Sequence, residues 1–377
     1  MNRPTYRTAI AALFATLCCS AAWAAYLKTD YEDTGIRERG PERPPDIVRY
    51  VPPPSVENPT VDLLRRVEVG APCRHLGLTV FPLLLSHGSA AHGIRTLDEA
   101  LGRGWITISE RDDAQISEVH VRNDSSEMVL LMTGEIISGG RQNRVIREDV
   151  LLPPRSGYIG IPVYCVEQER WSGRSDRFES PASLVHQDIR KSAVAGGSQD
   201  DVWREVDAKA ERAGVTSSTR NYQDIYENKR VGGQVDECVA RFRGFCRRDT
   251  VGAVAVVGNR IVSCDVFSDP ALFARLWSKL IRSCALEEVS PRVDRALYPG
   301  RRTGLDAGDI RRFLDRAVNA DYRQTHTPGA GRALTISGGA SGTAIVWDGE
   351  AVHLAVFPGM EILPMIYKNE LEAEERR

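Results

Sequence analysis

Short apolar runs separated by turn residues fill the chain between residues 76 and 166. Runs of this kind, whether continuous or alternating with polar residues, are typical of strands. One helix is predicted to interrupt them at residues 97–101, because Thr96 and Glu99 stand at the spacing of a capping box. The pattern predicts strands over residues 76–85, 105–110, 116–123, 128–137, 144–152 and 157–166.

Helical spacing replaces the strand pattern over residues 180–230, where apolar residues recur three or four positions apart. These amphipathic helices are expected to lie against the sheet. A further helix and three strands end the patterned part of the chain, and the Asp348-Gly349 pair between the last two strands is a hairpin signal. They are predicted at residues 309–318, 333–337, 343–347 and 351–357.

The most clearly marked unit lies between these regions. Two apolar runs at residues 251–257 and 261–267 flank a Gly258-Asn259 turn and lead into a long amphipathic helix. The start of that helix is marked by capping and first-turn residues, namely Ser268 or Asp269, followed by Pro270.

The order of these elements predicts an α+β fold with a mainly antiparallel β-sheet and packed helices. A β-rich first half is expected at residues 61–175 and a ββα-type second half at residues 176–360. The two halves are expected to pack as one unit.

The ends of the chain have a different character. Arg3 and Arg7 precede an apolar run that ends in Ala22-Trp23-Ala24, which is the pattern of a secretory signal at residues 1–24. A soluble protein exported to the periplasm or the medium is therefore expected, with no membrane span in the rest of the chain. Residues 25–60 predict a proline-rich extended or disordered lead, and residues 361–377 a charged tail.

Charge and motif content exclude several classes of function. The chain has 49 Lys and Arg against 51 Asp and Glu, and the two signs are interleaved, so no basic surface for nucleic acid is expected. The sequence has no HExxH motif, no CxxC pair and no phosphate-binding glycine loop, so neither a metal site nor a cofactor is predicted. His87 and His92 are the best candidates for a metal pair, although a loop is the simpler interpretation.

Two polar segments interrupt neighbouring strands and form the candidate site. In the first, Glu135 ends a strand and a Ser138-Gly139-Gly140 turn leads into Gln142, Asn143 and Arg144. Guanidinium and amide groups suit a carboxylate, phosphate or ribose ligand, but they could equally satisfy backbone groups at a sheet corner. The second segment contains Cys165, Glu167, Arg170 and Trp171, and adjoining strands are expected to bring it beside the first.

Cys165 and Trp171 each allow two interpretations. Cys165 could act as a nucleophile if a nearby cation stabilised its thiolate, but a buried structural thiol or half of a disulfide is the simpler interpretation. Trp171 could stack on a ring or sugar, or it could cap the core.

The QNR segment at residues 142–144 and the CVEQ segment at residues 165–168, followed by Arg170-Trp171, resemble the ARG and rhodanese-phosphatase-superfamily-associated protein domain family. Supporting matches lie at residues 96–101 and 251–283, and the resemblance covers roughly residues 61–357. It implies a domain of unknown function associated with ADP-ribosylglycohydrolase-type and phosphatase-type partners. It further implies an ADP-ribose-like or other phosphorylated-ribose ligand, surrounded by Glu135, Gln142, Asn143, Arg144, Glu167, Arg170 and Trp171.

The resemblance also draws attention to the cysteines, because residues 264 and 284 differ from what the family leads us to expect there. A strand residue and the helix that packs on it could meet, so a Cys264–Cys284 disulfide is predicted, with Cys238–Cys246 as a weaker second pair.

Three functions remain open. The leading hypothesis is a non-catalytic ligand-binding or accessory domain with an unknown small molecule or protein partner. The second is a hydrolase or transferase that uses Glu135 or Glu167 as general acid and base, or less favourably Cys165 as nucleophile. In the third, the QNR and CVEQxRW segments are a folding lock and the surface is an interaction platform; full burial of these side chains would favour it.

Overall fold

The computed structural model describes residues 58–86, 93–110, 117–170, 175, 177–289 and 304–359. Contacts divide the chain into two compact units, Met1–Val48 and Arg49–Arg377, and every described residue belongs to the second unit. The predicted signal, most of the proline-rich lead and the charged tail therefore lie outside the described residues.

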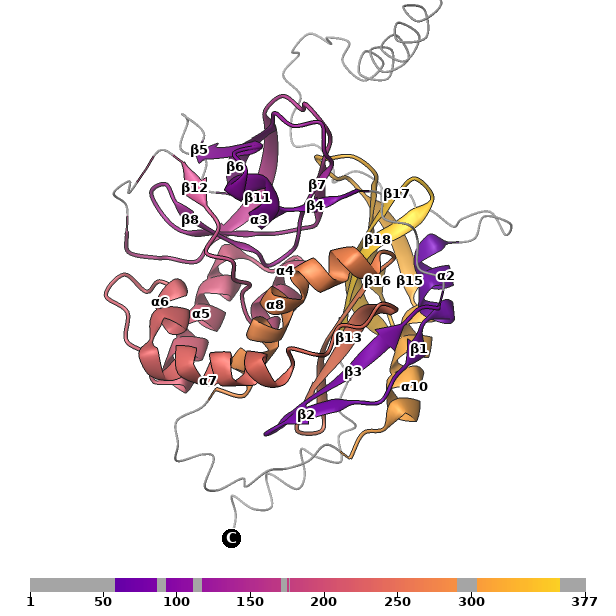
Figure 1. Ribbon diagram of the computed structural model, residues 1–377. Coiled ribbons are helices and arrows are strands. Elements are labelled where there is room, and N and C mark those ends of the chain that lie inside the picture. Colours follow the sequence, from indigo (N-terminus) through magenta and orange to yellow (C-terminus); the bar gives the residue numbers. More distant parts are fainter. Residues whose placement is uncertain are drawn as a thin grey trace, which may run out of the picture. The chain divides into compact units, whose positions relative to one another are not determined.

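Nine of the described strands form one antiparallel sheet that draws on both halves of the chain (Figure 1). β3 (Leu78–Leu84) from the first half pairs with β13 (Thr250–Val257) from the second. The order continues from β13 through β14 (Arg260–Phe267), β18 (Glu350–Pro358), β17 (Ala340–Trp347), β16 (Arg332–Ser337) and β15 (Asp321–Thr325). On the other side, β3 pairs with β1 (Glu68–Val69) and β2 (Cys73–His75).

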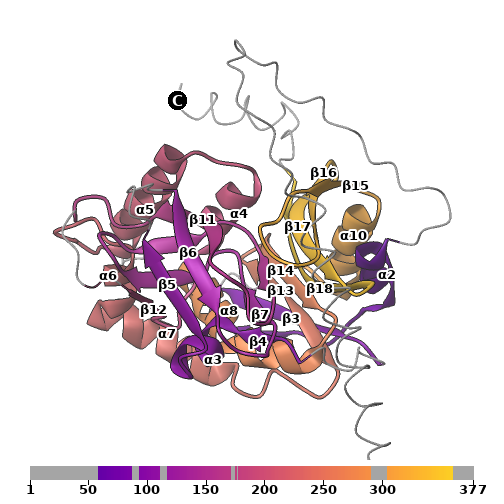
Figure 2. The same ribbon diagram turned by 90° about the horizontal axis from the view of Figure 1, so that it is seen from above.

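Helices cover both faces of this nine-stranded sheet (Figures 1 and 2). α8 (Pro270–Glu287) packs on one face, where Phe273 and Leu276 join one apolar core. α2 (Pro59–Arg66) and α10 (Ala307–Val318) pack on the opposite face, where Phe313 joins a second core. Successive side chains of a strand point to opposite faces of the sheet, and helices cover both faces. Side chains on both faces are therefore buried, which explains why these strands are continuous apolar runs in the sequence.

Six further strands form a second antiparallel sheet that curls on itself, here called the curled sheet. Its outer strands are β5 (Ile106–Glu110) and β12 (Phe178–Glu179), and within the described ranges they are joined by a single bridge between Ser109 and Arg177. Between them lie β6 (Glu118–Asn123), β11 (Ile159–Cys165), β9 (Arg144–Ile146) and β8 (Ile136–Gly139).

A three-stranded sheet and a short helix complete the core of the curled sheet. Leu97 of α3 (Leu97–Gly102) and Leu131 of β7 (Val129–Leu131) pack against Ile108 and Val121. The other two strands of this small sheet are β4 (Arg95–Thr96) and β10 (Val150–Leu152).

Four helices pack together beside the curled sheet and α8. They share one core with strand residues such as Ile136 and Tyr164 and with α8 itself. They are α4 (Gln187–Val194), α5 (Gln199–Ala213), α6 (Gln223–Glu227) and α7 (Lys229–Arg241). Within the described ranges, none of the helices combines the length and the hydrophobicity that a membrane-spanning segment needs.

The α+β fold class and the marked ββα unit are confirmed, and the structure also shows where the pattern was insufficient. The run predicted as one strand at residues 128–137 is two strands, β7 and β8, on different sheets. The break coincides with Gly134, which has a φ of 93° and where a Cβ atom would lie 2.7 Å from Cγ of Arg190. The close passage of this buried arginine therefore requires glycine and ends the pairing.

The predicted Cys264–Cys284 disulfide was wrong. Cys264 faces the core under α2 and α10, whereas Cys284 on α8 lies in the core on the other side of the sheet. The neighbouring residue Ser263 points toward α8, with its Oγ 3.8 Å from Sγ of Cys284. Because strand side chains alternate between faces, a shift of one residue places the thiol on the opposite side.

The weaker Cys238–Cys246 pair is not formed either, and both thiols are free. Each packs against the core shared by α7 and α8, and burial raises the pKa of both thiols to about 12. Both therefore remain protonated at neutral pH and contribute as small apolar side chains.

Candidate functional site

The two polar segments singled out in the sequence lie side by side in the structure. β9 pairs with β11, and their register sets Arg144 opposite Cys165. The residues beyond these strand ends therefore meet, and the backbone N–H of Asn143 donates to Oε2 of Glu167 over 3.2 Å. We call the buried group the Glu167 cluster, comprising Gln142, Asn143, Arg144, Cys165, Glu167 and Arg170.

Glu167 is 0% exposed and receives hydrogen bonds from several protein groups. Arg170 binds both carboxylate oxygens, with Nε 2.8 Å from Oε1 and Nη2 2.7 Å from Oε2, and the Thr219 hydroxyl donates to Oε1 over 3.0 Å. Burial alone would raise the pKa of Glu167, but the bonds from Arg170, Asn143 and Thr219 outweigh burial and lower that pKa. The carboxylate is therefore held ionised by internal donors.

The glycine turn after β8 supplies acceptors for Arg170. Its Nη1 donates to the carbonyl oxygen of Gly140 over 2.8 Å, and its Nη2 to that of Gly139 over 3.3 Å. Gly139 has a φ of 142°, and a Cβ atom there would lie 2.3 Å from the carbonyl oxygen of Arg177. The protein's own backbone therefore approaches this turn closely.

Arg144 and Cys165 are also engaged inside the cluster. Nη1 of Arg144 donates to Oε1 of Gln142 over 2.9 Å and lies 2.7 Å from Sγ of Cys165, while Nη2 lies 3.4 Å from Glu110. Burial raises the pKa of the Cys165 thiol to about 11, and Arg144 offsets only part of that effect. The thiol is thus protonated at neutral pH, which does not suit a nucleophile.

Glu135 belongs to a different network. Its Oε1 lies 2.5 Å from Nζ of Lys279 on α8, and its Oε2 accepts from the N–H of Met132 over 2.8 Å. Lys279 also lies 2.7 Å from Oδ1 of Asp98. Glu135 and Glu167 therefore have separate partners, and both carboxylates are 0% exposed. A paired-carboxylate mechanism would need both to face one substrate.

A small cavity opens beside the amide of Asn143. Nδ2 of Asn143 donates to Oδ1 of Asn221 over 3.1 Å, and both residues line a cavity of about 180 Å³ with Ser138 and Gln223. Pockets that hold drug-sized ligands usually begin at about 300 Å³. Of the Glu167 cluster, Asn143 lines this cavity, whereas Arg144 and Arg170 do not.

A third buried charge network, absent from the sequence predictions, joins α4 to the nine-stranded sheet. Arg190 of α4 is 0% exposed and binds both oxygens of Asp265 on β14, at 2.5 and 3.1 Å. His353 on β18 lies between two carboxylates, with Nδ1 2.5 Å from Asp149 and Nε2 3.3 Å from Asp265. We call Asp149, Arg190, Asp265 and His353 the Asp265 cluster.

The charges of the Asp265 cluster hold one another ionised. Burial alone would lower the pKa of His353, but Asp149 and Asp265 outweigh burial and raise it to about 9. Burial would raise the pKa of Asp265, but Arg190 and His353 outweigh it and lower that pKa. The same balance lowers the pKa of Asp149, chiefly through His353. The Asp265 cluster therefore contains two cations, Arg190 and His353, and two anions, Asp149 and Asp265.

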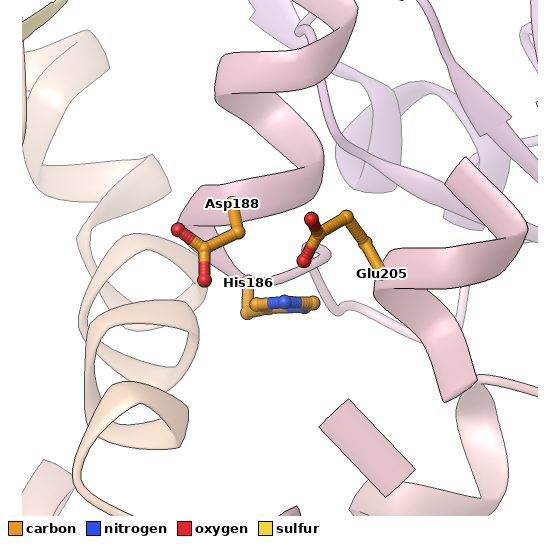
Figure 3. Close-up of side chains that lie close together, drawn as sticks. All are labelled: His186, Asp188 and Glu205. Atoms are coloured by element: carbon orange, nitrogen blue, oxygen red, sulfur yellow. The ribbon is translucent and has the colours of Figure 1, made fainter. Parts of the chain in front are cut away.

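Three residues close to the N-terminal end of α4 could hold a metal ion (Figure 3). A ring nitrogen of His186 and one oxygen each from Asp188 and Glu205 lie within 4.8 Å of one another. Little in the sequence indicated this group. His186 and Asp188 form only a short H-x-D pair, and Glu205 comes from the next helix, α5, so no single motif joins the three residues.

Several predicted residues lie outside the described part of the chain. They are Trp171, predicted either to stack on a ligand or to cap the core, and the candidate metal pair of His87 and His92.

The family model that matches the chain covers residues 66–357 and is described as the ARG and Rhodanese-Phosphatase-superfamily-associated Protein domain. The chain belongs to this family. The match confirms the resemblance drawn from the QNR and CVEQ segments, and the whole Glu167 cluster and Asp265 cluster fall within it. Comparison with curated proteins and with solved structures found no match.

Replacing Arg170 with Ala should lower the free energy of unfolding of this family member by about 3 kcal/mol, because Glu167 would remain buried without its cation. Arg141→Ala is the matched control, since Arg141 adjoins the same segment but its side chain is 51% exposed. That change should alter stability by less than about 0.5 kcal/mol. Urea unfolding followed by circular dichroism measures both, and equal effects would contradict the structural role of Arg170.

Stability should also depend on the ionisation of His353. Its pKa in the folded protein is about 9 against an ordinary 6.5, so its contribution is complete below pH 6.5 and is lost as the pH rises through 9. The loss should be on the order of 2–3 kcal/mol. The two carboxylates act in the opposite sense, because their lowered pKa values make their contribution disappear in acid.

The measurement is the free energy of unfolding in urea between pH 6 and pH 8.5 for the unchanged protein and for His353→Gln. Higher pH is avoided because the buried thiols, whose pKa is raised in the folded protein, ionise above about pH 8.5 in the unfolded chain and would add a decline of their own. The variant should be less stable at pH 6 and should lack most of the decline. Parallel curves for the two proteins would show that His353 is not the titrating group.

Proposed function

We propose that this chain is an exported, non-catalytic binding domain, in which the Glu167 cluster shapes the scaffold and the ligand occupies a neighbouring hollow. The observation that carries the proposal is that the charged side chains of the cluster are buried and already bonded to other protein groups. Glu167, Arg144 and Arg170 are at most 7% exposed, and each bonds to other protein groups. Side chains engaged in this way stabilise a fold, whereas a ligand site needs groups that converge on open space.

A hollow of about 420 Å³ lies where the curled sheet fails to close, and we call it the seam hollow. Its volume is within the range of small-molecule and peptide sites. Apolar side chains of Ile106, Ile108 and Phe178 line it together with polar and charged residues. The latter are Asp98, Thr107, Arg177, Glu179 and Ser180.

The walls of the seam hollow favour an extended peptide. One wall is β5 and the other is β12, which are the two outer strands of the curled sheet. In the described ranges, β5 pairs with β6 on one side and meets the opposite wall at Ser109 and Arg177. A peptide strand could therefore add to the free edge of β5 by main-chain hydrogen bonds.

The charges of the seam hollow suit a peptide that carries both positive and negative side chains better than they suit a phosphate group. Arg177 and Glu179 are exposed, while Asp98 already binds Lys279 and accepts from the Ser180 hydroxyl over 2.5 Å. Among the described residues that line the hollow, a phosphorylated ribose, the ligand implied by the family resemblance, would meet one guanidinium, that of Arg177. The two arginines expected to bind it, Arg144 and Arg170, are at most 7% exposed.

Gly102→Phe should block the seam hollow without straining the backbone. Gly102 lines the hollow, and a Cβ atom there would meet no heavy atom within 4 Å. Gly233→Phe is the matched control, because Gly233 also has open space around it but lies on α7. Binding should fall at least tenfold in Gly102→Phe and remain unchanged in Gly233→Phe.

The measurement is an array of extended ten-residue peptides, followed by fluorescence anisotropy for those that bind. ADP-ribose, ribose 5-phosphate and inorganic phosphate are tested in parallel by thermal shift. The proposal would be contradicted if the peptides bind the unchanged protein, Gly102→Phe and Gly233→Phe equally well. It would also be contradicted if none of the probes binds. A shift with ADP-ribose that depends on Arg177 would favour the phosphorylated-ribose ligand instead.

A further inference from the structure

The group formed by His186, Asp188 and Glu205 has the chemistry of a metal site and is separate from the seam hollow. His186 is the N-cap residue of α4, Asp188 lies in the first turn of that helix, and Glu205 projects from α5 (Figure 3). Figure 3 shows both carboxyl groups on the same side of the imidazole ring. The three potential ligand atoms lie within 4.8 Å of one another.

The imidazole of His186 supplies an independent indication of a missing ligand. His186 is 0% exposed, and Nε2 of its imidazole is buried without a hydrogen-bond partner among the described residues. A buried polar atom without a partner is unfavourable by about 1–3 kcal/mol, so such atoms are uncommon unless something binds them. A metal ion would accept the lone pair that Nε2 can offer.

The other side of the ring is already held in place. Nδ1 lies 3.1 Å from the hydroxyl of Tyr222, and the backbone N–H of His186 donates to the same oxygen over 2.7 Å. The two rings are stacked, with centroids 5.7 Å apart and planes 6° from parallel. Histidine ligands of metals are usually fixed through their second nitrogen in this manner, which leaves the first nitrogen as the ligand.

We propose that His186, Asp188 and Glu205 bind one divalent transition-metal ion, such as Zn²⁺ or Mn²⁺. One imidazole and two carboxylates form a mixed nitrogen and oxygen ligand set that suits such ions. Asp188 and Glu205 are half-buried, so water can complete the coordination shell from the solvent side. This proposal does not depend on the proposed binding function.

The side chains must move slightly to close around an ion. Two ligands that are each about 2.1 Å from one ion lie at most about 4.2 Å apart, which is less than the present limit of 4.8 Å. Both carboxylates are on the solvent side of the group, so small side-chain rotations can draw them in.

A neighbouring cation competes with the ion for Asp188. Nη2 of Arg212 lies 3.4 Å from Oδ2 of Asp188, and the Arg212 side chain is 50% exposed. Lys209 is buried nearby but binds the carbonyl oxygen of Leu286 and lies 3.8 Å from Glu287. Arg212 can therefore swing away when an ion binds, and removing its charge should strengthen binding.

The experiment is isothermal titration of chelator-treated, tag-free protein with Zn²⁺, repeated with Mn²⁺ by electron paramagnetic resonance. Mn²⁺ is included because thiols such as exposed Cys73 can bind Zn²⁺ but bind Mn²⁺ poorly. We expect one ion per chain, with binding weakened at least tenfold in Asp188→Asn and in Glu205→Gln. Arg212→Gln should bind more tightly than the unchanged protein.

Glu211→Gln is the matched control, because Glu211 lies on the same helix as Glu205 but is exposed and outside the group. It should bind as the unchanged protein does. Asp188 and Glu205 are only half-buried, so both variants should fold, which circular dichroism verifies. The proposal is overturned if neither ion binds saturably, or if Asp188→Asn and Glu205→Gln bind as tightly as Glu211→Gln.

Discussion

The ion pair between Arg190 and Asp265 is the interaction on which the arrangement of the two large sheets depends. Arg190 comes from α4, Asp265 from the nine-stranded sheet, and Asp149 from the segment leading into β10 beside the curled sheet. His353 links the two carboxylates. Buried charges are tolerated only when paired and hydrogen-bonded, so a displacement of either sheet would leave uncompensated charge.

Buried charges are also paired and hydrogen-bonded in the Glu167 cluster, at the end of the curled sheet. Arg170 binds the carboxylate of Glu167 and the carbonyl oxygens of a glycine turn, and so fixes the chain path between β8 and β9. Its residues resemble a ligand site in sequence because the same donors and acceptors that recognise a ligand can also bind one another. Burial distinguishes the two cases, and the two proposed binding sites lie elsewhere, at the seam hollow and beside His186.

Local sequence patterns predicted those features whose cause is local. The Thr96 capping box, the turn at Gly258-Asn259 and the N-cap at Asp269 each depend on residues a few positions apart. The meeting of Asn143 with Glu167 was also predicted from adjoining strands, although the strands that pair, β9 and β11, have β10 between them in the chain.

Features that depend on tertiary contacts could not be predicted in the same way. Asp149, Arg190, Asp265 and His353 come from four separate segments of the chain, and no local pattern marks them as partners. The Cys264 prediction failed because the sequence located the strand and helix correctly but did not determine which side chains of the strand face α8. His186 gave little signal for a similar reason, since its companion Glu205 lies on another helix.

A double-mutant cycle between Arg190 and Asp265 tests most directly whether buried charge pairs hold the sheets together. The free energy of unfolding is measured for the unchanged protein, Arg190→Met, Asp265→Asn and the double variant. The two substitutions should be strongly non-additive, with a coupling energy of about 2 kcal/mol or more and a double variant less destabilised than the sum of the single ones. A coupling energy near zero would contradict this account.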